Sequence, residues 1–165
     1  MFSICCLPMK SDLVLILPNI RSCHNVGAMF RTADACGFNK IYLVGYTPVP
    51  PRPEIEKVAL GAEKTTPWEH KKNVARLITS LKKQGYTVVA LEKAYESIEL
   101  GRLTKKILGT KIALIVGNEV DGIDKKTLLR SDIVTHIPMY GMKESLNVSI
   151  AAGIAMYAIR QFSVT

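Results

Sequence analysis

The sequence predicts an α/β fold with a mostly parallel sheet and helices on both of its faces. Short segments rich in Val, Ile and Leu alternate along the chain with longer amphipathic segments. The short segments are continuous apolar runs, which is typical of strands that a parallel sheet buries on both faces. We find no internal repeat and no linker, so the 165 residues are expected to form one domain.

The first elements are expected to be a strand, a helix and a second strand. Residues 13–17 are an apolar run that Pro18 ends, which predicts a buried strand. Within residues 24–37, apolar side chains recur at helical spacing and the segment closes on a glycine, a good helix stop. Residues 40–45 are a second apolar run and predict the second strand.

The middle of the chain begins with a proline-rich segment, residues 46–54. It is expected to be an extended loop, because proline restricts its own backbone and that of the preceding residue. Residues 54–70 predict only a short helical turn and a further loop. Residues 71–85 have the pattern of an amphipathic helix, and residues 86–92 have that of a third core strand. Residues 96–105 are weakly periodic and predict a link.

The last third of the chain predicts the most apolar strand and the longest helix. Residues 111–119 form that strand, which runs into a turn. Residues 124–131 predict a short helix, and residues 133–138 predict one more strand. After a loop, residues 145–162 predict a long apolar helix.

The charge balance indicates a polyanionic partner. Lys and Arg number 22 against 14 Asp and Glu, which gives a net charge of +8. A surplus of this size on a small domain favours nucleic acid as the partner. A basic surface without that role would have the same composition.

The cysteines indicate a reduced, cytoplasmic protein with no metal site. None of the four belongs to a CxxC pair, and no histidines accompany them at ligand spacing. Because no disulfide framework is suggested, an intracellular location is expected. No apolar run approaches the roughly 18 residues that span a membrane, so no membrane partner is expected.

Residues 1–12 are expected to be a poorly structured extension, and residues 13–165 are expected to be the single domain. The first residues are apolar but lack the basic start and the cleavage site of a signal peptide. Met9 opens a more typical beginning, so the sequence leaves the start at Met1 or at Met9 open.

Three places break the apolar pattern, and each follows a predicted strand. Ligands of open α/β sheets collect beyond the carboxyl ends of the strands, so this location indicates a site. At the first place, Asn25 could simply cap the helix by accepting a backbone N–H bond. Arg31 has small residues around it. It could pair with Asp34 at the surface, or it could present its planar fork to a phosphate.

The second place is Gly117-Asn118-Glu119, at the end of the most apolar strand. A glycine at a strand end lets a ligand approach the backbone closely. The glutamate alone is weak evidence, because most glutamates at such positions are solvent-exposed. Neither of the best-known nucleotide fingerprints, GxGxxG and GxxxxGK[ST], occurs in the chain.

The third place is the start of the last helix. Ser145 can cap that helix, but capping explains Asn147 poorly because asparagine is a mediocre helix former. A helix N-terminus with free N–H groups also binds anions or carboxylates. Small residues, among them Ala152 and Gly153, make the helix slim enough to pack closely against another backbone, such as a second subunit.

Taken together, the three places resemble the motifs of a known family. The segments are NVGAMFRTADACG (25–37), KIALIVGNEVDGI (111–123) and IPMYGMKESLNVSIAAGIAMY (137–157). They look like the three motifs of the TrmH (SpoU) group of the SPOUT class of RNA methyltransferases. The resemblance covers residues 13–162, and three motifs in the right order are more specific than any one of them.

This resemblance implies a fold and an activity. The fold would be an α/β domain whose C-terminal part is threaded into a deep trefoil knot, although general chain topology argues against knots. The protein would be a homodimer with its active site near the subunit interface. It would bind S-adenosylmethionine in the knot and methylate a ribose 2′-hydroxyl of tRNA or rRNA, with tRNA slightly favoured. No metal is implied.

The resemblance also assigns roles to residues. Those that match the catalytic positions are Asn25, Arg31, Glu119, Ser145 and Asn147. Those expected to bind the cofactor are Val116, Gly117, Ile137, Met139, Ser145 and Leu146. Arg31 matches the family's proposed base, but a guanidinium normally keeps its proton. We therefore expect it to bind phosphate and to stabilise the developing alkoxide.

The basic residues expected to contact RNA lie in loops or turns near the motifs: Arg21, Arg52, Lys57, Lys64 and Lys143. Phosphate contacts there would position the substrate, although a solvated basic face would look the same in sequence. Many relatives carry a further RNA-binding domain or extension, and target choice here is expected to rest on the catalytic domain. Three alternatives stay open: an RNA-binding protein on an inactive scaffold, an enzyme that methylates a base nitrogen, and a different nucleotide-binding α/β enzyme. The lack of a phosphate fingerprint argues against the third.

Overall fold

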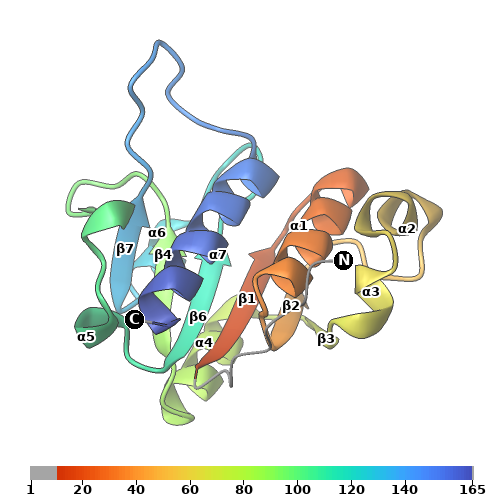
Figure 1. The fold of residues 1–165 in the computed structure, drawn as a ribbon, viewed down its shortest axis with the longest axis horizontal. Helices are drawn as coiled ribbons and strands as arrows, with labels where there is room; N and C mark the ends of the chain where they lie inside the picture. Colours follow the sequence, from red (N-terminus) through yellow and green to blue (C-terminus); the bar gives the residue numbers. More distant parts are fainter. Residues whose placement is uncertain (1–10, 165) are drawn as a thin grey trace, which may run out of the picture.

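The computed structural model describes residues 11–164, apart from the side chains of residues 105, 106, 163 and 164. They form a seven-stranded sheet in the order β3-β2-β1-β6-β4-β7-β5 (Figure 1), and every neighbouring pair is parallel. Most of the extension expected at residues 1–12 lies outside the described residues, and Asp12 already belongs to β1. The predicted parallel sheet is confirmed, whereas the knot stays a prediction.

The strands are short. Their bounds are β1 Asp12–Pro18, β2 Lys40–Val44, β3 Trp68–Lys71, β4 Thr87–Leu91, β5 Ile98–Glu99, β6 Lys111–Val116 and β7 Ile133–His136. β1 lies in the middle of the sheet, where Leu15 is in register with Ile41 of β2 on one side and with Leu114 of β6 on the other. The five predicted strands are confirmed, but β6 ends three residues and β7 two residues before the predicted ends.

The helices are α1 Cys23–Ala35, α2 Pro53–Ala59, α3 Ala62–Thr65, α4 Val74–Lys83, α5 Lys105–Leu108, α6 Lys125–Leu128 and α7 Val148–Val164, with a 3₁₀ turn, η1, at Leu100–Arg102. The four predicted helices correspond to α1, α4, α6 and α7. Both α4 and α7 begin three residues later than predicted. No helix within residues 11–164 is both long and apolar enough to cross a membrane.

The two faces of the sheet bury different helices. Alternate residues of β1 point to opposite faces: Leu13, Leu15 and Leu17 pack with α1 and α7, and Val14 and Ile16 pack with α4. Figure 1 shows α1 and α7 side by side in front of the sheet and α4 behind it. Burial on both faces explains why the strands are continuous apolar runs.

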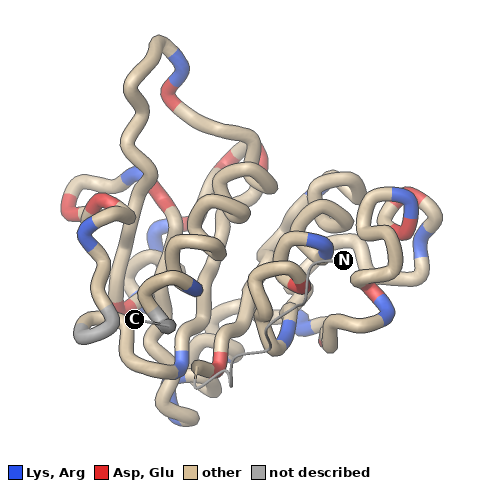
Figure 2. Tube along the Cα trace, in the orientation of Figure 1, with Lys and Arg blue, Asp and Glu red and all other residues tan. Residues whose placement is uncertain are grey.

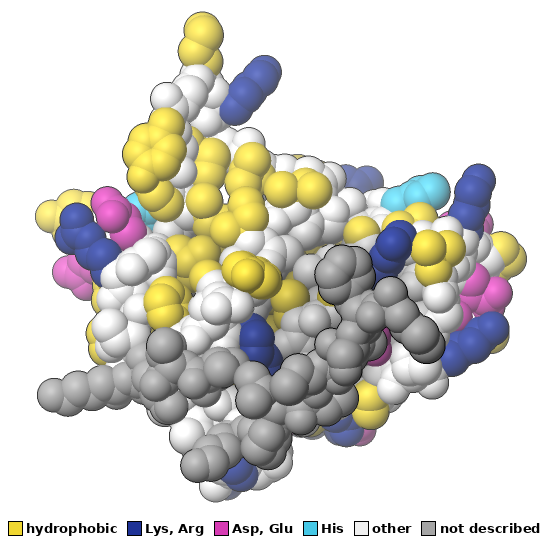
Figure 3. Space-filling model, in the orientation of Figure 1, with side chains coloured by type: hydrophobic (Ala, Val, Ile, Leu, Met, Phe, Trp, Pro, Cys, Tyr) yellow, Lys and Arg dark blue, Asp and Glu magenta, His cyan; other side chains and the backbone are white. Residues whose placement is uncertain are grey.

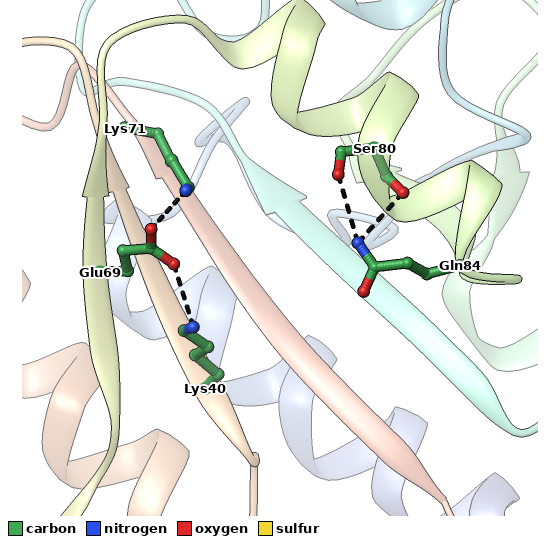
Figure 4. Close-up of polar contacts among 5 residues, drawn as sticks. All are labelled: Lys40, Glu69, Lys71, Ser80 and Gln84. Atoms are coloured by element: carbon green, nitrogen blue, oxygen red, sulfur yellow. Dashed lines mark hydrogen bonds and ion pairs between the residues drawn. The ribbon is translucent and has the colours of Figure 1, made fainter.

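The two outermost strands were not predicted, for a physical reason. Residues 54–70 were expected to hold only a helical turn and a loop, but they also contain α3 and most of β3. The β3 segment, WEHK, has no apolar run to signal a strand. Its carboxylate, Glu69, instead pairs with Lys40 (3.0 Å) and with Lys71 (Figure 4). At the other edge, β5 has only two residues, too few for a pattern.

Candidate cofactor pocket and its polar network

A pocket of about 500 Å³ lies at the carboxyl ends of β4, β6 and β7. Residues 91–93, 116–122, 136, 137 and 139 line it from the strand ends, and residues 144–148 line it from the start of α7. The predicted cofactor-binding residues all line this pocket: Val116, Gly117, Ile137, Met139, Ser145 and Leu146. The structure thus brings together the second and third sequence motifs, and the role of these residues stays a prediction.

The turn after β6 is closely packed and needs its glycine. A Cβ atom on Gly117 would lie 2.5 Å from the carbonyl carbon of Gly122, so any side chain there would displace backbone. Asn118 closes the turn, because its Oδ1 accepts from the backbone N–H groups of Val120 (2.8 Å) and Asp121 (2.6 Å). The turn is therefore fixed by local contacts before any ligand binds.

Glu92 also holds this turn, and the sequence analysis missed it. Its Oε2 accepts from the backbone N–H of Ile123 at 2.9 Å, and its carboxylate packs directly against Gly122. The sequence did contain a signal for Glu92. It is a polar residue at the end of a predicted strand, as Glu119 is at the end of the neighbouring strand in the sheet. Polar side chains at neighbouring carboxyl ends of a parallel sheet meet at one edge.

The carboxylate of Glu119 joins the β6 turn to the start of α1. Its Oε2 accepts from the Arg21 N–H (2.9 Å), and its Oε1 accepts from the Ser22 N–H (3.0 Å) and from the Asn25 amide (2.9 Å). Partial burial by itself raises the pKa of Glu119, but these hydrogen bonds outweigh burial and lower the pKa below its ordinary value of 4.5. Glu119 is therefore an ionised group that positions two loops.

Asn25 extends this network to the third motif. Its Oδ1 accepts from the Asn147 amide at 3.3 Å, and the Oδ1 of Asn147 accepts from the backbone N–H (2.9 Å) and the hydroxyl (2.7 Å) of Ser149. We name this chain of contacts, Glu119–Asn25–Asn147–Ser149, the polar network. It brings residues of all three sequence motifs together at the rim of the pocket.

Two expectations about helix caps were wrong. Asn25 lies inside α1, and the cap is Ser22, whose hydroxyl accepts from the Asn25 N–H at 3.3 Å. The last helix begins after Asn147, so Asn147 and not Ser145 accepts from its first turn. In both cases the serine or asparagine nearest the true start of the helix takes the cap, since only its side chain reaches the free N–H groups.

Arg31 lies away from the pocket. It is exposed and lines a separate hollow with Asp34, Leu60, Gly61 and Thr65, next to α2 and α3. Six residues separate Arg31 from Asn25, and at 3.6 residues per turn they point to different sides of α1.

The residues predicted to contact RNA are all exposed, but they do not form one group. Arg21 and Lys143 belong to segments that border the pocket, since Glu119 bonds to the first and Lys143 precedes the pocket residue Glu144. Arg52, Lys57 and Lys64 lie on the α2–α3 side. Within residues 11–164 no group of three or more His, Cys, Asp and Glu could hold a metal ion.

Comparison with known proteins places this geometry in context. A model of the SpoU rRNA Methylase family matches residues 12–157. The chain is 36% identical over 155 residues to the 23S rRNA (guanosine-2'-O-)-methyltransferase RlmB of Coxiella burnetii, covering 90% of this chain and 58% of that protein. It is 33% identical over 150 residues to the tRNA (guanosine(18)-2'-O)-methyltransferase of Aquifex aeolicus, covering 90% of this chain and 68% of that protein.

A solved structure agrees with the fold. The AdoMet-bound rRNA methyltransferase from Sinorhizobium meliloti superposes with a TM-score of 0.85 at 28% identity, covering 93% of this chain and 57% of that chain. The chain thus spans a little under three fifths of the length of RlmB from Coxiella burnetii and of this structure.

Proposed function

The chain belongs to the SpoU methylase family, and from that premise we propose that it methylates a ribose 2′-hydroxyl of tRNA or rRNA with S-adenosylmethionine. The observation that carries the proposal is the polar network at the rim of the pocket, because it unites three of the five residues that match the family's catalytic positions: Asn25, Glu119 and Asn147. The relatives named for this reaction include one that acts on rRNA and one that acts on tRNA, so both substrates are proposed.

The pocket residues fit S-adenosylmethionine. The volume is in the range of small-molecule sites, and Val116, Ile137, Met139 and Leu146 offer apolar walls for an adenine ring. Two glycines that pack closely against each other, Gly117 and Gly122, also line the pocket and bring no side chain into it. S-adenosylmethionine supplies a methyl group on a positively charged sulfur, which an oxygen nucleophile can displace.

The residues of the chain would orient the ribose and stabilise charge. The 2′-oxygen loses its proton as its bond to the methyl carbon forms, so negative charge develops on that oxygen. Arg31 would bind the adjacent phosphate and stabilise the developing charge. Asn25 and Ser145 would orient the ribose, and Glu119, which holds the loops through Arg21 and Ser22, would position Asn25.

A homodimer would bring Arg31 of one chain to the pocket of the other. Along α7, Ile150, Ile154 and Tyr157 are 56%, 42% and 62% exposed, at a spacing that places them on one side of the helix. Figure 3 shows hydrophobic side chains gathered over α7 and the loop before it. An apolar face of this kind is typical of a subunit interface.

We also propose that the reaction takes place in the cytoplasm, where its RNA substrates would be available, and that it needs no metal ion.

A methyl-transfer assay tests the proposal. Purified protein would be incubated with labelled S-adenosylmethionine and unmodified tRNA or rRNA, and the RNA would be digested to nucleosides for mass spectrometry. A 2′-O-methylnucleoside that is absent with Arg31→Ala is the expected result. A base-methylated product would contradict the ribose assignment, and cofactor binding without any product would favour the inactive scaffold.

A further inference from the structure

The net positive charge of the chain is concentrated behind the sheet. Residues 71–86 and 124–132, which contain α4 and α6, carry eight of the 22 Lys and Arg but only two of the 14 Asp and Glu. Residues 52–65, which contain α2 and α3, carry three of each, and the two signs alternate there in Figure 2. The surplus that indicated a polyanionic partner therefore lies on the α4 face, where no RNA contact was predicted.

Six cations of this face are exposed and make no ion pair among residues 11–164: Lys72, Arg76, Lys83, Lys125, Lys126 and Arg130. We call them the α4–α6 basic surface. Their neighbours Lys71 and Lys82 differ, because Glu69 and Asp132 hold them (Figure 4 for Lys71). An unpaired cation can bind a phosphate directly, whereas a paired cation must first break its ion pair with a carboxylate.

Three of these cations border one hollow of about 270 Å³: Lys72, Lys126 and Arg130. Its one carboxylate, Asp124, is occupied, since it accepts from the N–H (3.0 Å) and the hydroxyl (2.6 Å) of Thr127. The Arg130 guanidinium is held toward Lys126, whose backbone oxygen accepts from Nη1 at 3.1 Å. The hollow therefore combines a positive charge surplus with a preformed shape.

This hollow lies next to the cofactor pocket at the same edge of the sheet. Pro18, Asn19, Val44 and Gly45, at the carboxyl ends of β1 and β2, line it from the other side. Asn19 is two residues before Arg21, whose N–H binds the pocket residue Glu119, and Asp124 is two residues after Gly122 of the pocket. Two residues of extended chain span about 7 Å, so the two sites are separated by little more than a loop.

We infer that the α4–α6 basic surface binds the phosphates of the RNA strand next to the target nucleotide. The inference rests on the proposed function and adds a direction to it, because the strand would leave the pocket over the loops at residues 19–22 and 122–124 and continue behind the sheet. Lys and Arg that neutralise phosphates release counterions, so this contact would supply affinity and position without reading sequence.

Salt-dependent RNA binding tests the inference. The variant Lys72→Gln/Lys126→Gln would be compared with Lys40→Gln/Lys111→Gln, which changes the net charge equally. The control residues begin β2 and β6, so they lie at the amino ends of the strands and do not line the hollow. Fluorescence anisotropy would follow binding of a labelled, unmodified tRNA transcript and of a labelled 23S rRNA fragment, and thermal denaturation would verify the fold.

The first variant is expected to weaken binding of the preferred RNA at least about tenfold and to reduce the slope of log K against log salt by about 2. The control variant is expected to stay within about threefold of the unmodified protein. Equal losses in both variants, no loss in either, or no binding of either RNA by the unmodified protein would overturn the inference. Binding that depends on the surface without methyl transfer would contradict the proposed function alone, and methyl transfer with equal losses would contradict this inference alone.

Discussion

Two polar residues on α1 differ in their surroundings although they lie six residues apart. Asn25 is held from both sides by Glu119 and Asn147, at the rim of the cofactor pocket. Arg31 is exposed on another side of the helix and opens toward α2 and α3. Within one chain, the cofactor pocket therefore lies beside Asn25 and away from Arg31. In the proposed homodimer, the two sides of each chain would serve different active sites.

The largest effect is expected from the Arg31 side. Arg31→Ala should lower methyl transfer by about 10²–10³-fold, the range seen when one group that stabilises developing negative charge is removed. S-adenosylmethionine binding should be unchanged, because Arg31 does not line the pocket. Single-turnover kinetics and calorimetry would measure the two quantities. If the affinity for S-adenosylmethionine fell together with the rate, the two sides would not be separate.

Arg31→Lys distinguishes the two roles open to this residue. Substantial remaining activity would indicate that the positive charge is enough. A loss as complete as that of Arg31→Ala would indicate that the planar fork or proton transfer is needed.

The next effect should come from the floor of the pocket. Gly117→Ala places a methyl group 2.5 Å from backbone, so we expect a loss of about 1–3 kcal/mol in unfolding free energy and at least about tenfold weaker S-adenosylmethionine binding. Gly141→Ala is the matched control, because nothing lies within 4 Å of a Cβ atom there. Thermal denaturation and calorimetry would compare the two variants, and equal behaviour would show that the turn is not rigid.

A smaller effect is expected when the polar network is weakened. Glu119→Gln replaces an acceptor with an amide donor that faces the N–H groups of Arg21 and Ser22, so we expect a fall of about tenfold in methyl transfer. Glu96→Gln makes the same charge change at an exposed position and should leave the rate alone. An unchanged rate of methyl transfer in Glu119→Gln would contradict the proposal that Glu119 positions Asn25 for the reaction.

The smallest effect concerns pH. Because the pKa of Glu119 is lowered on folding, its hydrogen bonds contribute stability above pH 4.5, and this contribution disappears as the pH falls through the folded value. The difference in unfolding free energy between the unmodified protein and Glu119→Gln should be no more than about 1 kcal/mol, since the carboxylate is solvent-exposed. It should shrink below pH 4.5. Denaturant titrations between pH 3 and 8 would measure it, and a difference that grows on acidification would have the wrong sign.

Much of the fold could be predicted because burial on both faces gives the inner strands a clear apolar signal. The apolar runs at β1 and β6 identified these strands directly. Leu15 and Leu114, which are in register on the two strands, are fully buried. The edge strands have no such signal, because β3 depends on pairing by Glu69 and β5 is too short. Strand order also requires contacts between distant segments, which no local pattern contains.

The site was predictable in part. The residues that line the pocket were found, because the motifs follow strands whose carboxyl ends meet. The place of Arg31 was not, since helical spacing alone could not tell on which side of α1 its partners lie. The contacts of Asn25 with Glu119 and Asn147 were also hidden, because the residues are more than 90 positions apart. Glu92 was missed for a different reason: it was interpreted only as the last residue of a predicted strand, so no role in the site was considered.

Subunit mixing tests most directly whether the two sides of α1 serve different sites. Arg31→Ala and Gly117→Ala would be mixed, partly unfolded and refolded together. The mixture would be assayed for 2′-O-methyl transfer at an S-adenosylmethionine concentration too low to saturate the Gly117→Ala pocket. If Arg31 of one chain completes the pocket of the other, mixed dimers hold one intact site and the mixture recovers about a quarter of the unmodified activity. If no activity returns although mixed dimers form, Arg31 serves the pocket of its own chain and the account is contradicted.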